Sequence, residues 1–312
     1  MNVLSLFDGM SGGQQGFKTA NIKINKYYAS EIEEAPIKVT MKNHPNTVQL
    51  GDVRFLDTSK LDNIDILIGG SPCQSFSFAG KREGMATKDK IEIFTLEEYL
   101  EAKENNYEFE GFSYLFWEYI RILKEIKPKY FLLENVPMAK KWEDIISNTL
   151  GVKPLKFNSN VTSAQDRLRL YWTNIPDIQP PQDKNIYLND ILQNNIIHKY
   201  LPKTRQEYTN YDKTKVDKTI HKNTSIQLGS SKQFGCSVRS NGKAFTVRKT
   251  ECNGIIDEDY NIRKFTPIEV ERLFNFPDNY TLCDGVSTTK RYEMLGNGWD
   301  AGMIAHIFGF IK

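Results

Sequence analysis

Residues 3–13 read VLSLFDGMSGG, an apolar run that passes directly into a glycine-rich turn. Four further short apolar runs occur at residues 27–30, 65–69, 130–133 and 170–173. The segments between the runs have helical length, and within residues 113–127 the large apolar side chains recur at helical spacing. Strands that alternate with helices are typical of a doubly wound, mostly parallel sheet, so we expect an α/β fold.

The composition indicates a folded protein that is not built on disulfides or zinc. Of the 312 residues, 39% are hydrophobic and 12% are aromatic, which argues against wholesale disorder. No run approaches the ~18 uninterrupted apolar residues of a membrane helix, and the N-terminus lacks the pattern of a secretory signal. The four cysteines form no C-x-x-C pair and no metal-ligand spacing with the four histidines. We therefore expect a soluble enzyme or binding protein of a reducing compartment, without a metal.

The charge is distributed unevenly along the chain. Residues 199–249 contain twelve Lys and Arg but three Asp and Glu, whereas the other residues sum to −7. A basic lobe on an acidic body favours an anionic polymer partner such as nucleic acid. A solvated, lysine-rich surface would have the same charge, so this alternative stays open.

The regular pattern fails between residues 175 and 262 and then returns. We therefore expect an α/β domain in residues 1–174, a basic insertion in residues 175–262, and a C-terminal segment, residues 263–312, that completes the first domain. Thr95 and Glu98 form a T-x-x-E capping box, which predicts a short surface helix in the acidic stretch around them.

The glycine-rich turn favours a ligand beyond the carboxyl end of the first strand. In Phe7–Gly13 the glycines would let a ligand approach the backbone. Glu31 closes the second run, where a carboxylate can accept hydrogen bonds from a ribose, and Asp52 follows a third short run at residues 48–50. These features favour an adenosine-containing cofactor. The glycine spacing is not G-x-G-x-x-G, which disfavours a dinucleotide redox cofactor, although some glycine-rich turns only permit tight packing.

A cysteine follows the strand expected at residues 65–69. The sequence GGSPCQSFS places Cys73 among small and turn-forming residues, which argues against the buried, inert role of most lone cysteines. Downstream, Gly80 and Gly84 bracket basic residues in a loop that could close over a substrate and contact phosphates.

Charged side chains occur at and after the end of the fifth run. Glu134 follows two leucines, where its charge would be costly to desolvate without a partner or a task; a helix cap or a solvated strand end is the alternative. Arg167 and Arg169 would share one face of an extended segment, where they could position an anion or stabilise charge. A surface ion-pair network is the alternative for these arginines.

The chain resembles the C5-cytosine DNA methyltransferases in six segments that occur in that family's order. The segments are Phe7–Gly13, Gly70–Gln74, Glu134–Val136, Gln165–Arg169, Arg263–Pro277 and Gly296–Gly298. The likeness covers both α/β parts, about 220 residues, and leaves the basic insertion unmatched. The Phe7-Asp8-Gly9 form and the short insertion look more like the vertebrate de novo enzymes and some phage or bacterial members. One departure is Ser11, where many members have glycine; the other glycines of the turn predict that cofactor binding is retained.

The resemblance implies a class I, Rossmann-like methyltransferase fold with a small inserted target-recognition lobe. It also implies methyl transfer from S-adenosylmethionine to C5 of a cytosine that is flipped out of the duplex. The thiolate of Cys73 would add to C6, C5 would take the methyl group, and loss of the C5 proton with expulsion of the thiol would follow. Glu134 would contact the N3 and N4 edge, while two arginines would hold the cytosine carbonyl, its phosphate and the catalytic loop. The implied catalytic residues are Pro72, Cys73, Gln74, Glu134, Arg167 and Arg169.

The resemblance further assigns binding residues. The expected cofactor-binding residues are Phe7, Asp8, Gly9, Met10, Gly12, Gly13, Glu31, Ile32, Asp52, Val53, Asn297 and Trp299. Among them, Glu31 would bind the ribose, and Asp52 with Val53 would lie at the adenine. The expected DNA-binding residues are Lys81, Arg82, Arg205, Arg239 and Arg248. We expect double-stranded DNA as the partner, no membrane, a monomer with higher oligomers left open, and the cytoplasm of a bacterial or phage-infected cell.

Three alternatives remain open. The tRNA-methylating relatives share Pro-Cys-Gln and Glu-Asn-Val, but their Cys-Phe-Thr signature is absent because Cys236, Cys252 and Cys283 precede Ser, Asn and Asp. A catalytically inactive DNA-binding regulator would lose the nucleophile or the cofactor residues, and this chain keeps both. A Rossmann oxidoreductase is disfavoured by the glycine spacing. The sequence leaves open the DNA site and whether a restriction–modification pair, a phage or an orphan system contains the enzyme.

Overall fold

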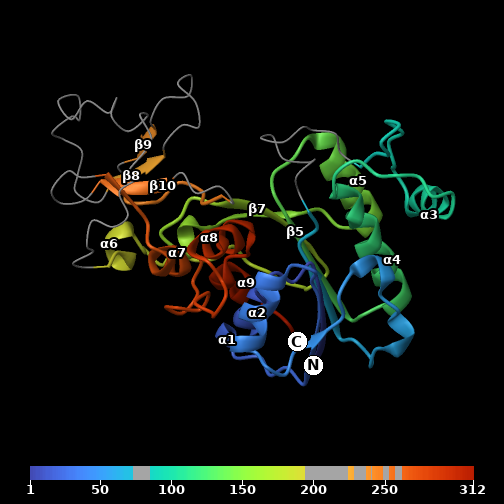
Figure 1. Cartoon of the computed structure of the whole chain (residues 1–312), viewed down its shortest axis with the longest axis horizontal. Helices are drawn as coiled ribbons and strands as arrows, with labels where there is room; N and C mark the ends of the chain where they lie inside the picture. Colours follow the sequence, from blue (N-terminus) through green and yellow to red (C-terminus); the bar gives the residue numbers. More distant parts are fainter. Residues whose placement is uncertain (73–84, 194–223, 228–236, 240, 249–252, 257–261) are drawn as a thin grey trace. The chain divides into compact units, whose positions relative to one another are not determined.

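The computed structural model describes most of the chain as two compact units. The described residues are 1–312 except 73–84, 194–223, 228–236, 240, 249–252 and 257–261. Unit 1 consists of residues 1–157, 168–179 and 307–312, and unit 2 consists of residues 158–167 and 180–306. Figure 1 shows the elements of both.

Unit 1 is built on a seven-stranded sheet with the order β3-β2-β1-β4-β5-β7-β6. The strands are β1 (Asn2–Leu6), β2 (Lys26–Ser30), β3 (Val48–Gln49), β4 (Ile66–Gly69), β5 (Tyr130–Asn135), β6 (Leu155–Asn158) and β7 (Leu168–Thr173). β1 pairs in parallel with β2 and β4, β4 pairs in parallel with β5, and β7 is antiparallel to β5. The predicted doubly wound, mostly parallel, Rossmann-like α/β sheet is confirmed.

Helices cover both faces of this sheet. They are α1 (Gly12–Thr19), α2 (Glu34–Asn43), α4 (Phe116–Ile126) and α5 (Lys140–Leu150), while α3 (Leu96–Glu104) packs against α4. In Figure 1, α1 and α2 lie on one side of the sheet, and α4 and α5 lie on the other. The helix predicted in residues 113–127 is α4, whose buried side chains include Trp117 and Ile120. The predicted capping box is also present, because Thr95 accepts a hydrogen bond from the Glu98 amide and Glu98 accepts one from the Thr95 amide, both at 3.1 Å.

The strand order reverses beside β1. From β1 the chain proceeds through β2 and β3 in one direction, and β4 and β5 extend the sheet in the other. Open α/β sheets bind ligands outside the carboxyl ends of the strands at such a reversal. The segments after β1, β2 and β4 contain the predicted cofactor turn, Glu31 and the Ser71-Pro72 pair, and β5 ends with Glu134 and Asn135. The topology therefore gathers these residues at one edge of unit 1.

Unit 2 contains a four-stranded antiparallel sheet and several helices. The sheet has the order β11-β10-β8-β9, formed by β8 (Thr224–Gln227), β9 (Ser237–Arg239), β10 (Asn253–Ile256) and β11 (Ile262–Lys264). The helices are α6 (Leu188–Ile191), α7 (Pro267–Leu273), α8 (Thr288–Asn297) and α9 (Ala301–Phe308), whose last two residues belong to unit 1. Buried Arg–Glu ion pairs hold both ends of α7: Arg263 with Glu269 at 2.8 Å and Arg291 with Glu271 at 2.9 Å.

Candidate active site

The turn after β1 has an unusual backbone. Phe7, Gly9 and Ser11 all have positive φ angles, between 57° and 59°. Glycine adopts this region without strain, and a Cβ placed on Gly9 would find no other heavy atom within 4 Å, so the space over the turn is open. The buried Ser11 is held by its hydroxyl, which donates to the Asp8 carboxylate and accepts from the Thr40 hydroxyl at 3.2 Å. Glycine would adopt this left-handed backbone at position 11 without strain.

Asp8 lies within the turn and bonds to its own neighbours. Its carboxylate accepts hydrogen bonds from the hydroxyls of Ser11 and, at 2.7 Å, Tyr27, while its backbone amide donates to the Ser30 carbonyl at 3.1 Å. Burial raises the pKa of Asp8 to about 6, helped by the charge of Glu31 and opposed by the hydroxyl donors. The Asp8 side chain therefore stabilises the conformation of the turn by bonding Ser11 within it and Tyr27 of β2.

Glu31 connects the turn to the end of β2. One carboxylate oxygen accepts from the Gly9 amide at 2.8 Å, and the other accepts from the amides of Ile32 and Glu33 at 2.7 and 2.9 Å. A carboxylate has about four acceptor positions, so Glu31 retains capacity for a further donor such as a ribose hydroxyl. The bonds fix the carboxylate at the carboxyl edge of the sheet, beside the open backbone of Gly9.

The segment after β3 forms a 3-10 turn, η1 (Val53–Phe55), capped by Asp52. Asp52 accepts from the Arg54 amide at 2.9 Å and pairs with the Arg54 guanidinium, which lowers the pKa of the Asp52 carboxyl. Val53 is buried, but Phe55 is 80% exposed and Ile32, after the neighbouring β2, is 65% exposed. Large exposed apolar side chains at a ligand edge can cover an aromatic ring. The sequence did not lead us to predict a role for Phe55. An aromatic residue three positions after Asp52, beyond the end of a strand, could have indicated one.

The approach to the predicted nucleophile is anchored by two side chains. The amide of Asn135 donates to the hydroxyl of buried Ser71 at 3.1 Å and to its carbonyl at 3.2 Å, and the Ser113 hydroxyl donates to the Pro72 carbonyl at 3.1 Å. The two residues that precede position 73 are thus held in place. Ser113 carried no signal in the sequence. The predicted residues Cys73, Gln74, Lys81 and Arg82 lie outside the described residues.

Glu134 has the partner that its burial requires. Gly69 pairs with Leu133 between β4 and β5, so Glu134 lies one step further toward the ligand edge. Glu134 is 9% exposed and forms an ion pair with Arg169 of β7 at 3.0 Å. In the antiparallel register Glu134 is opposite Tyr171, so Arg169 is its diagonal neighbour across the two strands. A carboxylate fixed by a guanidinium can serve as an oriented hydrogen-bond or proton-transfer group.

Arg167 lies in unit 2 and has different surroundings. Its buried guanidinium donates to the carbonyls of Val247, Gly296 and Gly298 at 3.1, 3.3 and 2.9 Å, and it lies 4.9 Å from the centre of the Phe274 ring. Arg167 thereby fixes the segment that contains two predicted cofactor residues. Asn297 is exposed at the end of α8, and Trp299 is half-buried.

The predicted base-reading arginines differ in their contacts. Arg239 ends β9, pairs with Asp166 and lies 4.4 Å from the centre of the Phe245 ring, whereas Arg248 is exposed. Arg205 lies outside the described residues. The sequence reading missed Lys243, a buried lysine whose ammonium donates to backbone carbonyls of unit 2, including that of Asn160 at 2.7 Å; its burial lowers the pKa.

The part of the chain that the structure describes has neither a metal-binding cluster nor a membrane-spanning helix. No group of three His, Cys, Asp or Glu side chains there could hold a metal ion. No described helix is long and apolar enough to cross a membrane.

A family model described as C-5 cytosine-specific DNA methylase matches residues 1–312. The chain belongs to this family. The recognition from six ordered motif segments is thus confirmed, the chain is a methyltransferase, and the oxidoreductase alternative is excluded.

Curated relatives and solved structures agree with this membership. The Type II methyltransferase M1.ScrFI of Lactococcus lactis subsp. cremoris is 29% identical over 95% of this chain and 74% of its own length. The Type II methyltransferase M.NgoPII of Neisseria gonorrhoeae is 26% identical over 100% of this chain and 95% of its own. The Entamoeba histolytica methyltransferase EhMeth matches with a TM-score of 0.69 at 19% identity, covering 99% of this chain and 97% of that one. At that identity the structural match shows the fold.

Proposed function

We propose that the chain is a DNA (cytosine-5)-methyltransferase that uses S-adenosylmethionine as methyl donor. The observation that carries the proposal is the arrangement at the reversal of strand order. The Gly9–Glu31 edge lies on the β1 and β2 side of the reversal, and the anchored Ser71-Pro72 pair lies on the β4 and β5 side with Glu134. A methyl donor and a base bound at these two places would meet at the reversal.

The residues on the β1 and β2 side fit a nucleoside cofactor. Glu31 keeps an acceptor position for the ribose, Gly9 leaves open space over the turn, and Ile32 and Phe55 expose apolar surface that a purine ring could cover. Asp52 follows the neighbouring strand with a carboxylate that could accept from the adenine amino group. The bound donor supplies an electrophilic methyl group. We also assign Asn297 and Trp299 to this cofactor, on the family motif alone.

The base side supplies the nucleophile and the acid. The Cys73 thiolate adds to C6 of the flipped cytosine, and the electron pair of the C5–C6 double bond moves toward N3, where Glu134 donates a hydrogen bond or a proton. C5 would then take the methyl group, and a proton given to N3 would return to Glu134. Loss of the C5 proton restores the double bond as the thiolate leaves, so the cysteine is unchanged at the end. Arg169 keeps the Glu134 carboxyl oriented throughout.

For the polymer substrate we propose double-stranded DNA, read by residues 175–262 inserted between the two catalytic parts, 1–174 and 263–312. The similarity to Type II methyltransferases supports DNA, as does the net +9 charge of residues 199–249. We assign Arg239 and Arg248 to base edges, and we propose the role of a modification enzyme in the cytoplasm, paired with a restriction endonuclease.

Methylation assays on purified substrates test this function. The enzyme with labelled S-adenosylmethionine should methylate duplex DNA but not tRNA, and bisulfite sequencing should map the product to cytosines in one short sequence. A duplex with 5-fluorocytosine should trap the enzyme covalently, and Cys73→Ala should abolish both the trap and turnover while DNA binding persists. Methylation confined to tRNA would overturn the DNA assignment, and an adduct with Cys73→Ala would overturn the nucleophile.

A further inference from the structure

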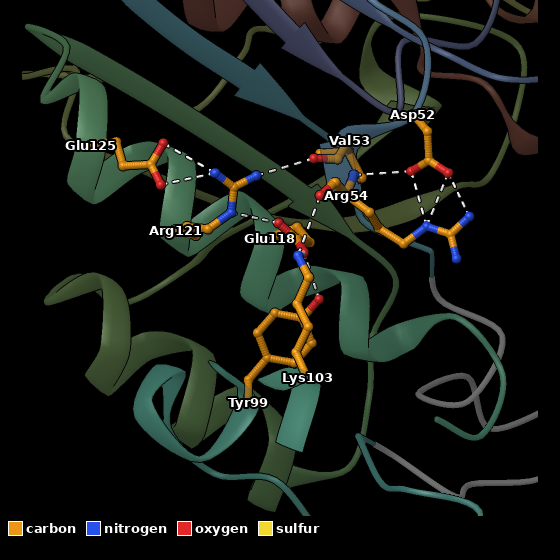
Figure 2. Close-up of polar contacts among 8 residues, drawn as sticks. All are labelled: Asp52, Val53, Arg54, Tyr99, Lys103, Glu118, Arg121 and Glu125. Atoms are coloured by element: carbon orange, nitrogen blue, oxygen red, sulfur yellow. Dashed lines mark hydrogen bonds and ion pairs between the residues drawn. The ribbon is translucent and has the colours of Figure 1, made fainter. Parts of the chain in front are cut away.

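Glu118 of α4 is a charged residue that the proposed chemistry does not use. It is completely buried, and its carboxylate accepts hydrogen bonds from Tyr99 at 2.6 Å, Lys103 at 2.6 Å and Arg121 at 2.7 Å (Figure 2). A buried carboxylate costs several kcal/mol unless it is paired and hydrogen-bonded, and the three donors meet this requirement. Tyr99 and Lys103 come from α3, so Glu118 joins α3 to α4.

The two cations on Glu118 also hold the backbone of η1. Arg121 donates a second nitrogen to the Val53 carbonyl at 3.2 Å, and Lys103 donates to the Arg54 carbonyl at 3.3 Å. Figure 2 shows these bonds running from α3 and α4 toward the turn capped by Asp52. Two successive carbonyls of η1 are therefore fixed by side chains that meet on one carboxylate.

The buried side chain of Val53 anchors the turn in the core, and the bonds to its carbonyls constrain its backbone directly. The bonds between Asp52 and Arg54 are local, because they join residues two positions apart and would survive a rotation of the whole turn. The bonds from Arg121 and Lys103 bridge 68 and 49 residues of sequence, and they tie the turn to helices packed on the sheet. A bound carbonyl fixes its peptide plane, and with it the direction of the neighbouring groups that face the ligand edge.

We propose that Glu118, with Arg121 and Lys103, forms a positioning cluster that orients η1 for recognition of the adenine ring of the cofactor. The inference rests on the proposed placement of the adenine at Asp52 and Val53. None of the three cluster residues need touch the cofactor. Their effect is to hold the turn in the one orientation in which the Asp52 carboxylate meets the adenine amino group.

Arg121→Lys separates positioning from charge. The lysine keeps a cation for Glu118, but a single ammonium lacks the planar fork that reaches Glu118, Val53 and Glu125 together. Losing the Val53 bond should weaken binding of S-adenosylhomocysteine about tenfold, the equivalent of about one hydrogen bond. At saturating cofactor, kcat should stay within about twofold. Affinity for S-inosylhomocysteine, which lacks the amino group, should change much less, so discrimination between the two ligands narrows.

Glu125→Gln is the matched control. It alters the exposed partner of the same guanidinium and leaves the bonds from Arg121 to Glu118 and Val53 in place. We expect both affinities to stay within about twofold of the wild type. Urea unfolding of both variants reports any general loss of stability, which a structural role alone would show without a change in discrimination.

The outcomes distinguish this inference from the proposed function. If Arg121→Lys weakens both ligands equally, or weakens neither, the positioning cluster is overturned. Asp52→Asn tests the adenine placement directly. If Asp52→Asn removes discrimination while Arg121→Lys retains it, the positioning inference alone fails. If Asp52→Asn leaves discrimination intact, the adenine placement fails and the positioning inference fails with it, whereas methyl transfer by Cys73 stands.

Discussion

Replacing Asp8 with asparagine should make unit 1 more stable near neutral pH. Burial raises the pKa of this carboxyl to about 6, so the folded protein holds the proton more tightly than the unfolded chain does. Asparagine has a similar shape and cannot ionise. Its single oxygen can still accept from one of the two hydroxyls, Tyr27 or Ser11, which donate to different oxygens of Asp8 in the wild type; loss of the other bond does not depend on pH.

The sign and size of the effect follow from the two pKa values. Because the unfolded carboxyl has a pKa of about 3.9, the wild type loses stability as pH rises through the window from about 4 to about 6. The full effect is about 3 kcal/mol. Part of it is already lost at about pH 4.5, so between about pH 4.5 and about pH 7.5 the wild type should lose about 2 kcal/mol relative to Asp8→Asn.

A comparison of variants is needed because a second group titrates in the same window. Burial lowers the pKa of His44 to about 4, so its contribution to stability falls as the pH decreases from about 6.5, opposite to that of Asp8. The difference between the wild type and Asp8→Asn cancels this term. Urea unfolding followed by tryptophan fluorescence suits the measurement, since three of the four tryptophans (117, 142 and 172) belong to unit 1.

Asp62→Asn is the matched control. Lys26 and Tyr28 bond to Asp62 and lower its pKa, so its contribution is already complete above about pH 4, and the difference from the wild type should be flat across the window. A flat difference for Asp8→Asn as well would show that the carboxyl is ionised in the folded protein at every pH tested. That result would refute the argument that burial outweighs its hydroxyl donors.

Four further predictions concern single side chains. Glu134→Gln should lower the single-turnover rate by about 10² to 10⁴-fold with DNA binding retained, and a wild-type rate would limit Glu134 to a structural role. Arg239→Ala should reduce discrimination at one base position by about 1–3 kcal/mol in competition binding, and uniform weakening would contradict base reading. Lys215→Ala, from the basic segment, should weaken all sequences alike and reduce the salt slope of log affinity by ~1, where an unchanged slope would argue against a phosphate contact. Thr95→Ala removes the α3 cap and should lower the free energy of unfolding of unit 1 by about 1 kcal/mol in urea; an unchanged value would show that water replaces the cap.

The sheet of unit 1 could be predicted because its central strands are buried on both faces. β1 and β4 are almost wholly buried and therefore read as short apolar runs. The sheet of unit 2 could not be predicted in this way. Its strands have three or four residues, and polar side chains occupy buried positions: Ser225 accepts from the Phe245 amide, and Asn253 donates to the Phe245 and Thr246 carbonyls. Hydrogen bonds replace apolar contacts there, so the alternation of apolar and polar residues is lost.

In the candidate site, too, the residues that follow a local sequence pattern could be predicted and the long-range contacts could not. Glu31 and Glu134 could be singled out because each follows an apolar run of the sequence, and the carboxyl ends of parallel strands share one edge. The contacts of Ser113 with Pro72 and of Arg121 with Val53 could not, because they join segments 41 and 68 residues apart with no local pattern. Arg167 and Arg169 were predicted to share a face. They have separate partners instead, because β7 begins only at Leu168 and Arg167 lies before it. Arg167 bonds to carbonyls of unit 2, whereas Arg169 pairs with Glu134 of unit 1.

Ser11, the departure from the family motif, and Asp8, the carboxyl with the raised pKa, depend on each other. A residue with a Cβ at φ +59° is strained by about 1–2 kcal/mol, which glycine avoids. The hydroxyl that comes with the Cβ donates to Asp8, a carboxyl whose burial would otherwise lack this donor, and accepts from Thr40. Serine is therefore tolerated in the turn because Asp8 is present, and the half-buried Asp8 carboxyl is stabilised partly by the serine hydroxyl. The turn keeps the left-handed backbone that glycine would give it, so the open face at Gly9 and its bond to Glu31 are preserved where we propose that the cofactor binds.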